Sequence, residues 1–307
     1  GLVGSEMCIR DRNRRPFQRQ NFALYRGRSM TKTTRLTAAI TGAGDGIGRA
    51  LAINLNERGI DLYLCDISQE RLDTTVAMLD TTRSSVFMAL VDCGNRRDIE
   101  AWAASITAEN DCLDFLFNNA GVAYGAQFRE ASLDNFEWLM NINYWGVVWC
   151  TKALLPLLEA SPSGHLVNIS SIFGMVGIAT QSAYNSAKFA VRGFTESLQA
   201  EYRGTSLTVT CVHPGGIATN IALRARIDGE SSEVSAEERD ESFKQVARTS
   251  PTKAAQVIMK GTLAGRRRVF IGWDAWLMHT ITKFMPTSYH AITCLLYTSP
   301  SPRDLAR

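Results

Sequence analysis

Long apolar runs and ordered cysteine spacings are both missing from this chain. No stretch reaches the roughly 18 apolar residues that a membrane-spanning helix needs. Five of the seven cysteines lie in the body of the chain and form neither a CxxC pair nor another metal-ligand spacing: Cys65, Cys93, Cys112, Cys150 and Cys211. Scattered cysteines of this kind usually serve as small apolar residues, and they are typical of proteins in a reducing compartment. We therefore predict a cytoplasmic protein with no membrane span and no bound metal.

Basic charge is also scarce once the two ends are set aside. The whole chain has 33 basic and 30 acidic residues, a formal net charge of +3. Residues 1–29 hold seven arginines against two acidic residues, and residues 294–307 hold two against one. The remaining 264 residues have 24 basic and 27 acidic side chains, a net charge of −3. No nucleic-acid partner is expected, because such a partner requires a basic surface.

The two ends of the chain are related to each other at the level of DNA. DNA that can encode residues 4–11 encodes residues 294–301 on its opposite strand, one frame over. This inverted repeat resembles a sequencing-library adapter translated in place. We expect residues 1–29 (adapter and leader) and 294–307 (adapter tail) to be non-native and disordered, and residues 30–293 to form one domain. The alternative is a real basic arm or targeting peptide at residues 13–29, but that segment lacks the apolar core of a secretory signal.

Short apolar runs alternate with helical patterns over residues 30–293. Such runs are typical of parallel strands that are buried on both faces. The expected strands cover residues 36–41, 62–66, 85–91, 114–117, 165–169, 207–212 and 268–272. This alternation predicts a single-domain α/β fold of Rossmann type, a doubly wound parallel sheet of about seven strands flanked by helices. Ligands of such sheets bind at the carboxyl ends of the strands.

A glycine-rich turn follows the first expected strand and precedes a helix that stops at Gly59. The turn reads Gly42-Ala43-Gly44-Asp45-Gly46-Ile47-Gly48, in the spacing TGxxxGxG rather than GxGxxG. Strand, turn and helix are the context of a dinucleotide-binding loop, whose glycines let a pyrophosphate approach the helix N-terminus. A glycine turn with no ligand is the alternative.

Two acidic residues beside this turn favour NAD over NADP. Asp66 ends the second expected strand, where a carboxylate can accept hydrogen bonds from a ribose 2′-hydroxyl and would repel a 2′-phosphate. Asp45 adds a second negative charge inside the glycine turn. Asp66 could also cap the helix that starts near Ser68, and the two roles are compatible.

Further polar side chains fall at the ends of other expected strands or inside the next helix. Asp92 follows the third strand, where it could meet an adenine or cap a helix. Asn118-Asn119-Ala120-Gly121 follows the fourth strand and could tie strands together and line the cofactor cleft. Asn143 lies among apolar residues of the expected helix 133–158. Either a kink at which Asn143 holds a water or a satisfied buried amide would explain it.

Tyr184 and Lys188 lie four residues apart, on one face if this stretch is helical. A free tyrosine has a pKa near 10 and is a poor proton-transfer group at pH 7. A cation beside it favours the phenolate, and reaching a pKa of about 7 takes about 4 kcal/mol of differential interaction. We expect Lys188, together with a positively charged nicotinamide ring, to lower the pKa of Tyr184. The alternative is an ordinary helix face.

Six motifs occur in a fixed order: TGAGDGIG, NNAG, the asparagine of MNINYWG, ISS, YNSAK and HPGGIATN. Together they resemble the short-chain dehydrogenase/reductase family, in its compact single-domain branch, over about residues 33–272. That family carries a serine thirteen residues before the active tyrosine, which selects Ser171 rather than Ser170.

The resemblance implies a role for each motif residue. Tyr184 would be the general acid/base at the substrate oxygen, Ser171 would hydrogen-bond that oxygen, and Lys188 would lower the Tyr184 pKa and bind the nicotinamide ribose. Asn143 would hold a water that relays protons from Lys188 to solvent. The residues that would contact the dinucleotide are Gly42, Gly46, Ile47, Gly48, Asp66, Asp92, Asn119, Gly121, Tyr184, Lys188, Pro214, Ile217 and Thr219. Ile217 and Thr219 would hold its carboxamide.

The sequence therefore predicts an oxidoreductase that moves a hydride between NAD and an alcohol or ketone. An NADP-dependent carbonyl reductase and a regulator that binds NAD without turnover are the alternatives. Phe173, Met175, Val176 and an acid-rich lid near residues 228–242 would border an apolar substrate pocket. The family often forms dimers and tetramers through its long helices, so we expect a homodimer or homotetramer. An amphipathic segment at residues 273–284 would cover the substrate site, meet a partner subunit or touch a membrane.

Overall fold

The structure is a computed structural model that describes residues 35–229, 235, 237, 238, 241, 243 and 247–289. The predicted leader, the predicted tail and most of the predicted lid lie outside the described residues.

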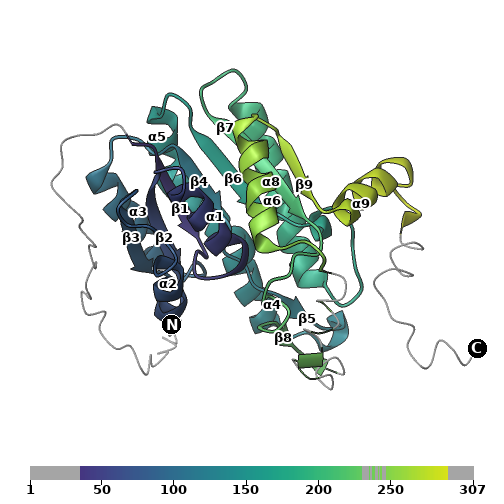
Figure 1. Ribbon diagram of the computed structural model, residues 1–307. Coiled ribbons are helices and arrows are strands. Elements are labelled where there is room, and N and C mark those ends of the chain that lie inside the picture. The colour runs from purple at the N-terminus through teal and green to yellow at the C-terminus, as the bar shows by residue number, and fades with distance from the viewer. Residues whose placement is uncertain are drawn as a thin grey trace, which may run out of the picture.

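Seven parallel strands form one sheet in the described part of the chain, as predicted (Figure 1). Their order across the sheet is β3-β2-β1-β4-β6-β7-β9. The strands are β1 (Thr37–Thr41), β2 (Asp61–Asp66), β3 (Val86–Leu90), β4 (Phe115–Asn118), β6 (His165–Ile169), β7 (Thr208–Pro214) and β9 (Arg268–Ile271). The order reverses between β1 and β4, and this reversal opens a crevice at their carboxyl ends.

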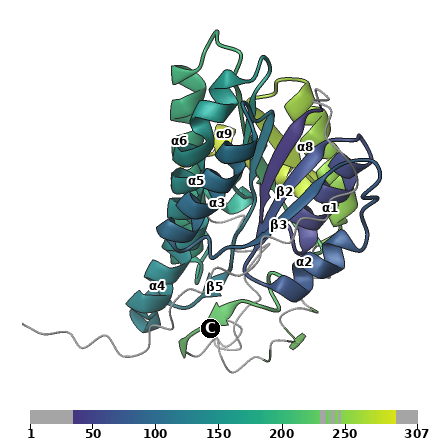
Figure 2. The same ribbon diagram turned by 90° about the vertical axis from the view of Figure 1, so that its left-hand side faces the viewer.

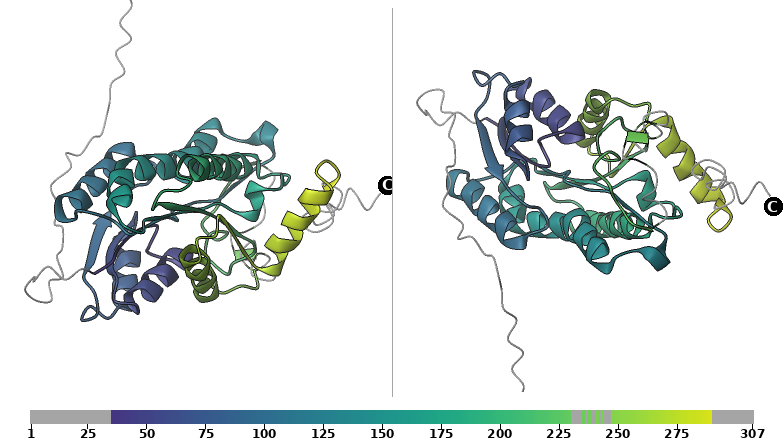
Figure 3. Two further views of the ribbon diagram at one scale, coloured as in Figure 1. Left: turned by 90° about the horizontal axis from the view of Figure 1, so that it is seen from above. Right: turned by 90° about the horizontal axis from the view of Figure 1, so that it is seen from below.

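Helices cover both faces of the sheet, so that three layers are visible in the end-on views (Figure 3). Figure 2 shows α1, α2 and α8 on one face and α3, α5 and α6 on the other. Their bounds are α1 (Gly46–Asn56), α2 (Gln69–Val76), α3 (Arg96–Glu109), α5 (Gly146–Ala160), α6 (Ser182–Glu201) and α8 (Pro251–Leu263). The strands are mostly apolar because both of their faces are covered.

Neighbouring residues of β1 pack into different cores. Ala38 and Ile40 pack with α1 and α8 on one face, whereas Ala39 packs with α3 and α5 on the other. This alternation is the two-residue period of a strand. The parallel register pairs Ile40 with Phe117, so β1 and β4 end level with each other.

The predicted helix 133–158 is interrupted in the structure. It consists of α4 (Leu133–Met140), a π-helical turn η2 (Asn141–Trp145) and α5. The π turn is closed by a hydrogen bond from the Gly146 amide to the Asn141 carbonyl. Such turns widen a helix by one residue and are frequent at functional sites. The irregularity expected at Asn143 is therefore present.

Two further elements frame the edge of the site. A short pair, β5 (Tyr124–Gly125) and β8 (Arg226–Ile227), joins the segment after β7 to the segment after β4. Its anchor is Asp228, which accepts hydrogen bonds from the Tyr124 hydroxyl at 2.6 Å and the Ser132 amide at 3.1 Å. The first residue of the predicted lid is thus held in place.

Helix α9 (Trp273–Phe284) lies beyond β9 at the edge of the sheet (Figure 1). Its buried residue Met278 packs with Met175 and Val176, two of the residues that were predicted to border an apolar pocket. Phe173 remains beside Tyr184, edge-on to its ring at 6.1 Å between centroids. No described helix is long and apolar enough to cross a membrane.

Candidate active site

The glycine turn after β1 is packed too closely for side chains. Gly42 has a φ of +64°, and a Cβ there would lie 2.8 Å from the Cα of Ala120. A Cβ on Gly48 would collide with the Gly42 carbonyl oxygen and lie 2.6 Å from the Asn119 side-chain nitrogen. Only glycine fits either position. The turn is therefore a tight cradle at the N-terminus of α1, as a pyrophosphate site requires.

Asn119 ties the end of β4 to this cradle. Its side-chain amide donates to the carbonyls of Thr41 at 3.0 Å and Gly42 at 3.1 Å. The Thr41 hydroxyl accepts from the amides of Asn119 and Ala120, each at 3.0 Å. The sequence placed Asn119 against the cofactor but missed Thr41. The available signal was a hydroxyl side chain at the last position of an apolar strand.

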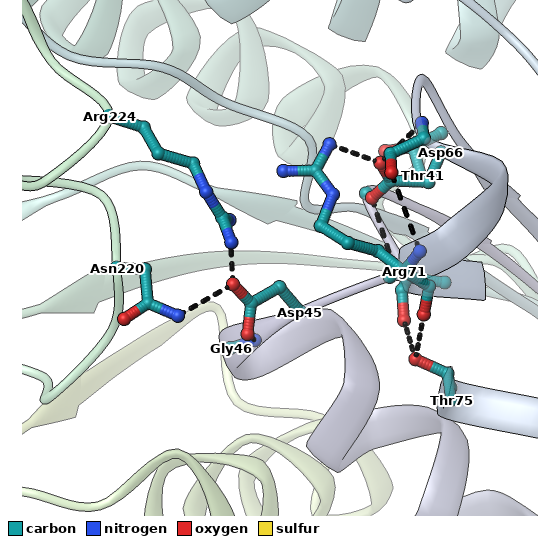
Figure 4. A network of polar contacts seen from close by, with 12 residues as sticks. Thr41, Asp45, Gly46, Asp66, Arg71, Thr75, Asn220 and Arg224 are labelled. Atoms are coloured by element: carbon teal, nitrogen blue, oxygen red, sulfur yellow. Dashed lines mark hydrogen bonds and ion pairs between the residues drawn. The ribbon is translucent and has the colours of Figure 1, made fainter. Parts of the chain in front are cut away.

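Asp66 at the end of β2 accepts hydrogen bonds from three protein donors (Figure 4). Its carboxylate accepts from the Gly44 amide at 3.0 Å, the Ser68 amide at 3.0 Å and the Arg71 guanidinium at 2.6 Å. The cap of α2 is the Ser68 side chain and not Asp66. Arg71 was missed in the sequence, although an arginine in the first turn of the helix after Asp66 was a usable signal.

Asp45 caps α1 and reaches across to the segment after β7 (Figure 4). It accepts from the Asn220 side chain at 2.9 Å and the Arg224 guanidinium at 2.6 Å. Burial alone would raise the pKa of Asp45, but the hydrogen bonds from Asn220 and Gly46 and the pairing with Arg224 lower it overall. Both carboxylates that were predicted to repel a 2′-phosphate are therefore paired with arginines.

Ser171, Tyr184 and Lys188 meet at the carboxyl end of β6. Ser171 caps the short turn η3 (Ile172–Gly174), with its hydroxyl accepting from the Phe173 amide at 3.1 Å. Tyr184 and Lys188 lie one turn apart on α6, and the Lys188 nitrogen is 5.7 Å from the centre of the Tyr184 ring. That nitrogen is buried and donates to the Ile169 carbonyl at 3.0 Å.

The pKa values of this pair are shifted in opposite directions. Burial raises the pKa of Tyr184 to about 12, although a hydrogen bond with Ser171 acts in the opposite direction. Burial also lowers the pKa of Lys188 to about 8. The expectation that Lys188, together with a positively charged nicotinamide ring, lowers the pKa of Tyr184 stays a prediction. In the chain by itself, burial is the largest cause of both shifts.

Ser170 has a different role from its neighbour. Its hydroxyl donates to the Lys188 carbonyl at 2.8 Å, and a Cβ on Gly174 would lie 2.7 Å from the same oxygen. Ser170 and Gly174 thus hold η3 closely against α6. This contact keeps Ser171 and the two α6 side chains together.

Asn143 in the π turn is a satisfied buried amide. Its oxygen accepts from the Val122 amide at 2.8 Å, and its nitrogen donates to the Val122 carbonyl at 2.9 Å. A Cβ on Gly121 would lie 3.3 Å from the Asn143 oxygen and 3.5 Å from the Lys188 nitrogen. Gly121 therefore allows the ends of β4 and α6 and the π turn to meet.

The segment after β7 closes the other side of the cradle. β7 ends at Pro214, and Ile217 forms a bridge with Thr249. The Thr219 amide donates to the Ile217 carbonyl at 2.8 Å, and the Thr219 methyl would lie 3.0 Å from a Cβ on Gly46. Thr219 therefore lies beside the glycine turn, whereas Ile217 is buried in the hydrophobic core.

Two predicted cofactor residues, Ile47 and Asp92, make contacts within the protein. Ile47 packs against the hydrophobic core beneath α1. Asp92 accepts from the Gly94 amide at 2.8 Å and shapes the turn after β3, and the cap of α3 is Asn95. The helix-cap interpretation of Asp92 is therefore wrong. No group of three or more metal-ligating side chains occurs among the residues that the structure describes.

Known proteins are similar to this chain in both sequence and fold. The protein-family model described as short chain dehydrogenase matches residues 36–229. The Mycobacterium tuberculosis protein named "Putative oxidoreductase SadH" is 41% identical over 258 residues, which cover 83% of this chain and 92% of that protein.

Two solved structures are also similar. A short chain dehydrogenase/reductase from Burkholderia phymatum in complex with NAD is 25% identical, with a TM-score of 0.72 over 89% of this chain and 98% of that one. A serine dehydrogenase complexed with NADP+ is 26% identical, with a TM-score of 0.64 over 77% of this chain and 93% of that one. The chain thus belongs to the short-chain dehydrogenase/reductase family of oxidoreductases, whose fold binds NAD or NADP.

Proposed function

We propose that the chain is an NAD-dependent alcohol dehydrogenase or carbonyl reductase, with Tyr184 as the general acid/base. The observation that carries the proposal is the meeting of Ser171, Tyr184 and Lys188 at the end of β6, beside a glycine cradle that no side chain could share. A bound nicotinamide dinucleotide supplies or accepts the hydride, and its oxidised ring adds a positive charge to the site.

The side chains of the chain handle the proton and the substrate oxygen. In carbonyl reduction the Tyr184 hydroxyl donates its proton to the substrate oxygen, while the Ser171 hydroxyl hydrogen-bonds that oxygen as negative charge develops on it. In alcohol oxidation the Tyr184 oxygen takes the alcohol proton. Lys188 holds positive charge beside the phenol, and a water bound near Asn143 passes protons to solvent.

The Tyr184 pKa supports reduction as the easier direction at neutral pH. A phenol with a pKa of about 12 is protonated at pH 7 and can act as an acid without further activation. Alcohol oxidation needs the phenolate, so it depends on added positive charge and is favoured by alkaline pH.

Asp66 supports NAD, because its carboxylate lies at the end of β2 beside the glycine turn. NADP is the second candidate, and the pairing of Asp66 with Arg71 favours it.

We also propose a small, apolar alcohol or ketone as substrate, since Phe173 lies edge-on to Tyr184. The family resemblance further supports a cytoplasmic homodimer or homotetramer, formed through α4–α5 and α6. Trp145 and Phe189 on these elements are 43% and 40% exposed.

The experiment is a spectrophotometric assay of the purified chain at 340 nm with NAD and a panel of alcohols, and with NADH and a panel of ketones. The proposal predicts turnover of at least one apolar substrate. The competing function is a regulator that binds NAD without turnover. Tight NADH binding with no reaction across the whole panel would favour that regulator and contradict the enzyme.

A further inference from the structure

The helix that follows the last strand of the sheet begins with an acidic side chain that reaches back to the end of β7. Asp274 lies in the first turn of α9, just past the end of β9 (Figure 1). Its carboxylate accepts a hydrogen bond from the Gly216 amide at 2.7 Å, across 58 positions of the chain. Within the described residues this carboxylate forms no ion pair, so its partner is a backbone amide.

The backbone around the Asp274 carboxylate leaves room for it alone. A Cβ on Gly215 would collide with both carboxylate oxygens, and a Cβ on Gly272 would collide with one of them. Gly272 also has a φ of +93°, a conformation that glycine adopts readily. The carboxylate therefore fills a gap between the ends of β7 and β9 that exists because both flanking residues are glycines.

The amide held by this carboxylate begins the segment that reaches the glycine turn. The Gly216 carbonyl accepts from the Thr249 amide at 3.3 Å, and Ile217 forms a bridge with Thr249. Thr219 follows Gly216 by three positions and lies beside Gly46. A displacement of Gly216 would therefore be passed on to the residues that border the cradle.

The strand order places this segment at the reacting end of the proposed site. The sheet runs β2-β1-β4-β6-β7, with the glycine turn after β1 and Ser171 after β6. In the proposed reaction the nicotinamide ring lies beside Ser171 and Tyr184, and the pyrophosphate lies on the glycine turn. The adenosine then extends away toward β2. The segment after β7 therefore borders the nicotinamide ring and not the adenosine.

We propose, on the basis of the function proposed above, that Asp274 is a positioning residue for the nicotinamide ring. It acts through Gly216, because a charge-assisted hydrogen bond fixes the start of residues 216–219 and so the wall against which the ring is held. The carboxylate does this without touching the dinucleotide. Its loss leaves the adenosine end unchanged, because that end is formed by residues at the ends of β1 and β2.

The test compares two ligands that differ only in the nicotinamide ring. NADH is titrated into the full chain by its fluorescence, and ADP-ribose, which lacks the ring, is titrated by calorimetry. Asp274→Ala should weaken NADH by about fivefold or more and ADP-ribose by less than about twofold, because the ring alone depends on the lost hydrogen bond. Asp274→Asn keeps an oxygen that can accept from Gly216 and should restore most of the NADH affinity. Asp274→Ser, whose hydroxyl is one bond too short for that amide, repeats the test if the alanine variant is unstable.

A second readout separates positioning from packing. With a substrate that the wild type converts, and with saturating NADH, Asp274→Ala should lower kcat by about tenfold, since a misplaced ring reacts slowly even when it is bound. The KM of the substrate should change by less than about threefold, because no substrate contact is removed.

A matched control comes from Asp134, an exposed acidic residue in the first turn of α4. Asp134→Ala removes the same kind of charge from a helix N-terminus and should change neither dissociation constant. Thermal unfolding of each variant shows whether it is folded. Equal weakening of NADH and ADP-ribose by Asp274→Ala, or unchanged NADH binding, would overturn the inference and leave the proposed function intact. A folded wild type that binds neither ligand would remove both proposals.

Discussion

At the scale of single residues, the site consists of groups whose burial opposes their ionisation. Burial moves the pKa of Tyr184 up to about 12 and that of Lys188 down to about 8. The cost of holding Lys188 away from water is offset in part by the Ile169 carbonyl. Strongly shifted groups that meet in this way are typical of catalytic sites.

Ser170 and Ser171 are adjacent, but the structure gives them separable roles. Ser171→Ala should lower kcat by about 10²–10³, as removal of one donor to a developing oxyanion does, and should lower the unfolding free energy by about 1 kcal/mol, because η3 loses its cap. Ser170→Ala should leave kcat within a few-fold and lower the unfolding free energy by about 1 kcal/mol, because it loses one hydrogen bond to the Lys188 carbonyl. Steady-state kinetics and urea denaturation of both variants check this. Loss of activity only in Ser170→Ala would contradict the assignment.

His213 on β7 predicts a pH dependence of stability. Its ring is fully buried, its Nδ1 donates to the Ser171 carbonyl at 3.1 Å, and burial lowers its pKa to about 4. Between pH 6.5 and 4 the unfolded chain binds a proton at this residue and the folded chain does not. The unfolding free energy should therefore fall on acidification through this window, by a contribution on the order of 3 kcal/mol.

The measurement is the unfolding free energy from pH 7 to 4 for the wild type and for His213→Asn, which keeps a donor near Ser171. The variant should lose less stability on acidification. His279→Asn is the control, because His279 stacks on the same Phe270 ring but is only partly buried. Identical slopes for the wild type and His213→Asn would show that another group carries the effect.

At the scale of elements, strand positions were predictable and the contacts between elements were not. All seven strands of the main sheet lie within two residues of the predicted ranges, because an apolar run bounded by glycines and polar residues carries its own signal. For the π turn inside residues 133–158, the only signal in the sequence was the pair of asparagines, Asn141 and Asn143. The β5–β8 pair, with two residues in each strand, had no detectable pattern.

The glycine turn offers a test of packing between elements. Gly48→Ala should cost about 1–3 kcal/mol of unfolding free energy and weaken dinucleotide binding, because its methyl would collide with the Gly42 carbonyl. Gly193→Ala, inside α6 with no atom within 4 Å of the new methyl, should stabilise the chain by about 0.5–1 kcal/mol. Urea denaturation of both variants gives the two values. A neutral Gly48→Ala would show that the cradle is looser than the structure has it.

At the scale of the whole molecule, the site joins segments that are far apart in the chain. Asp45 meets Arg224 across 179 positions, and Asn119 meets Thr41 across 78. The topology of a parallel sheet explains why the predicted residues converge, since every strand delivers its carboxyl end to one edge. It does not specify which arginine reaches which carboxylate. Sequence reasoning therefore predicted which strand ends converge, but it missed the arginines that pair with Asp45 and Asp66.

The central claim is that Tyr184 exchanges a proton with the substrate oxygen at this edge of the sheet. The most direct measurement compares the wild type with Tyr184→Phe, using one substrate that the wild type converts and following both turnover at 340 nm and NADH binding. The account predicts that Tyr184→Phe binds NADH with an affinity close to that of the wild type and loses activity by about 10²-fold or more. A Tyr184→Phe variant that turns over at the wild-type rate would contradict it.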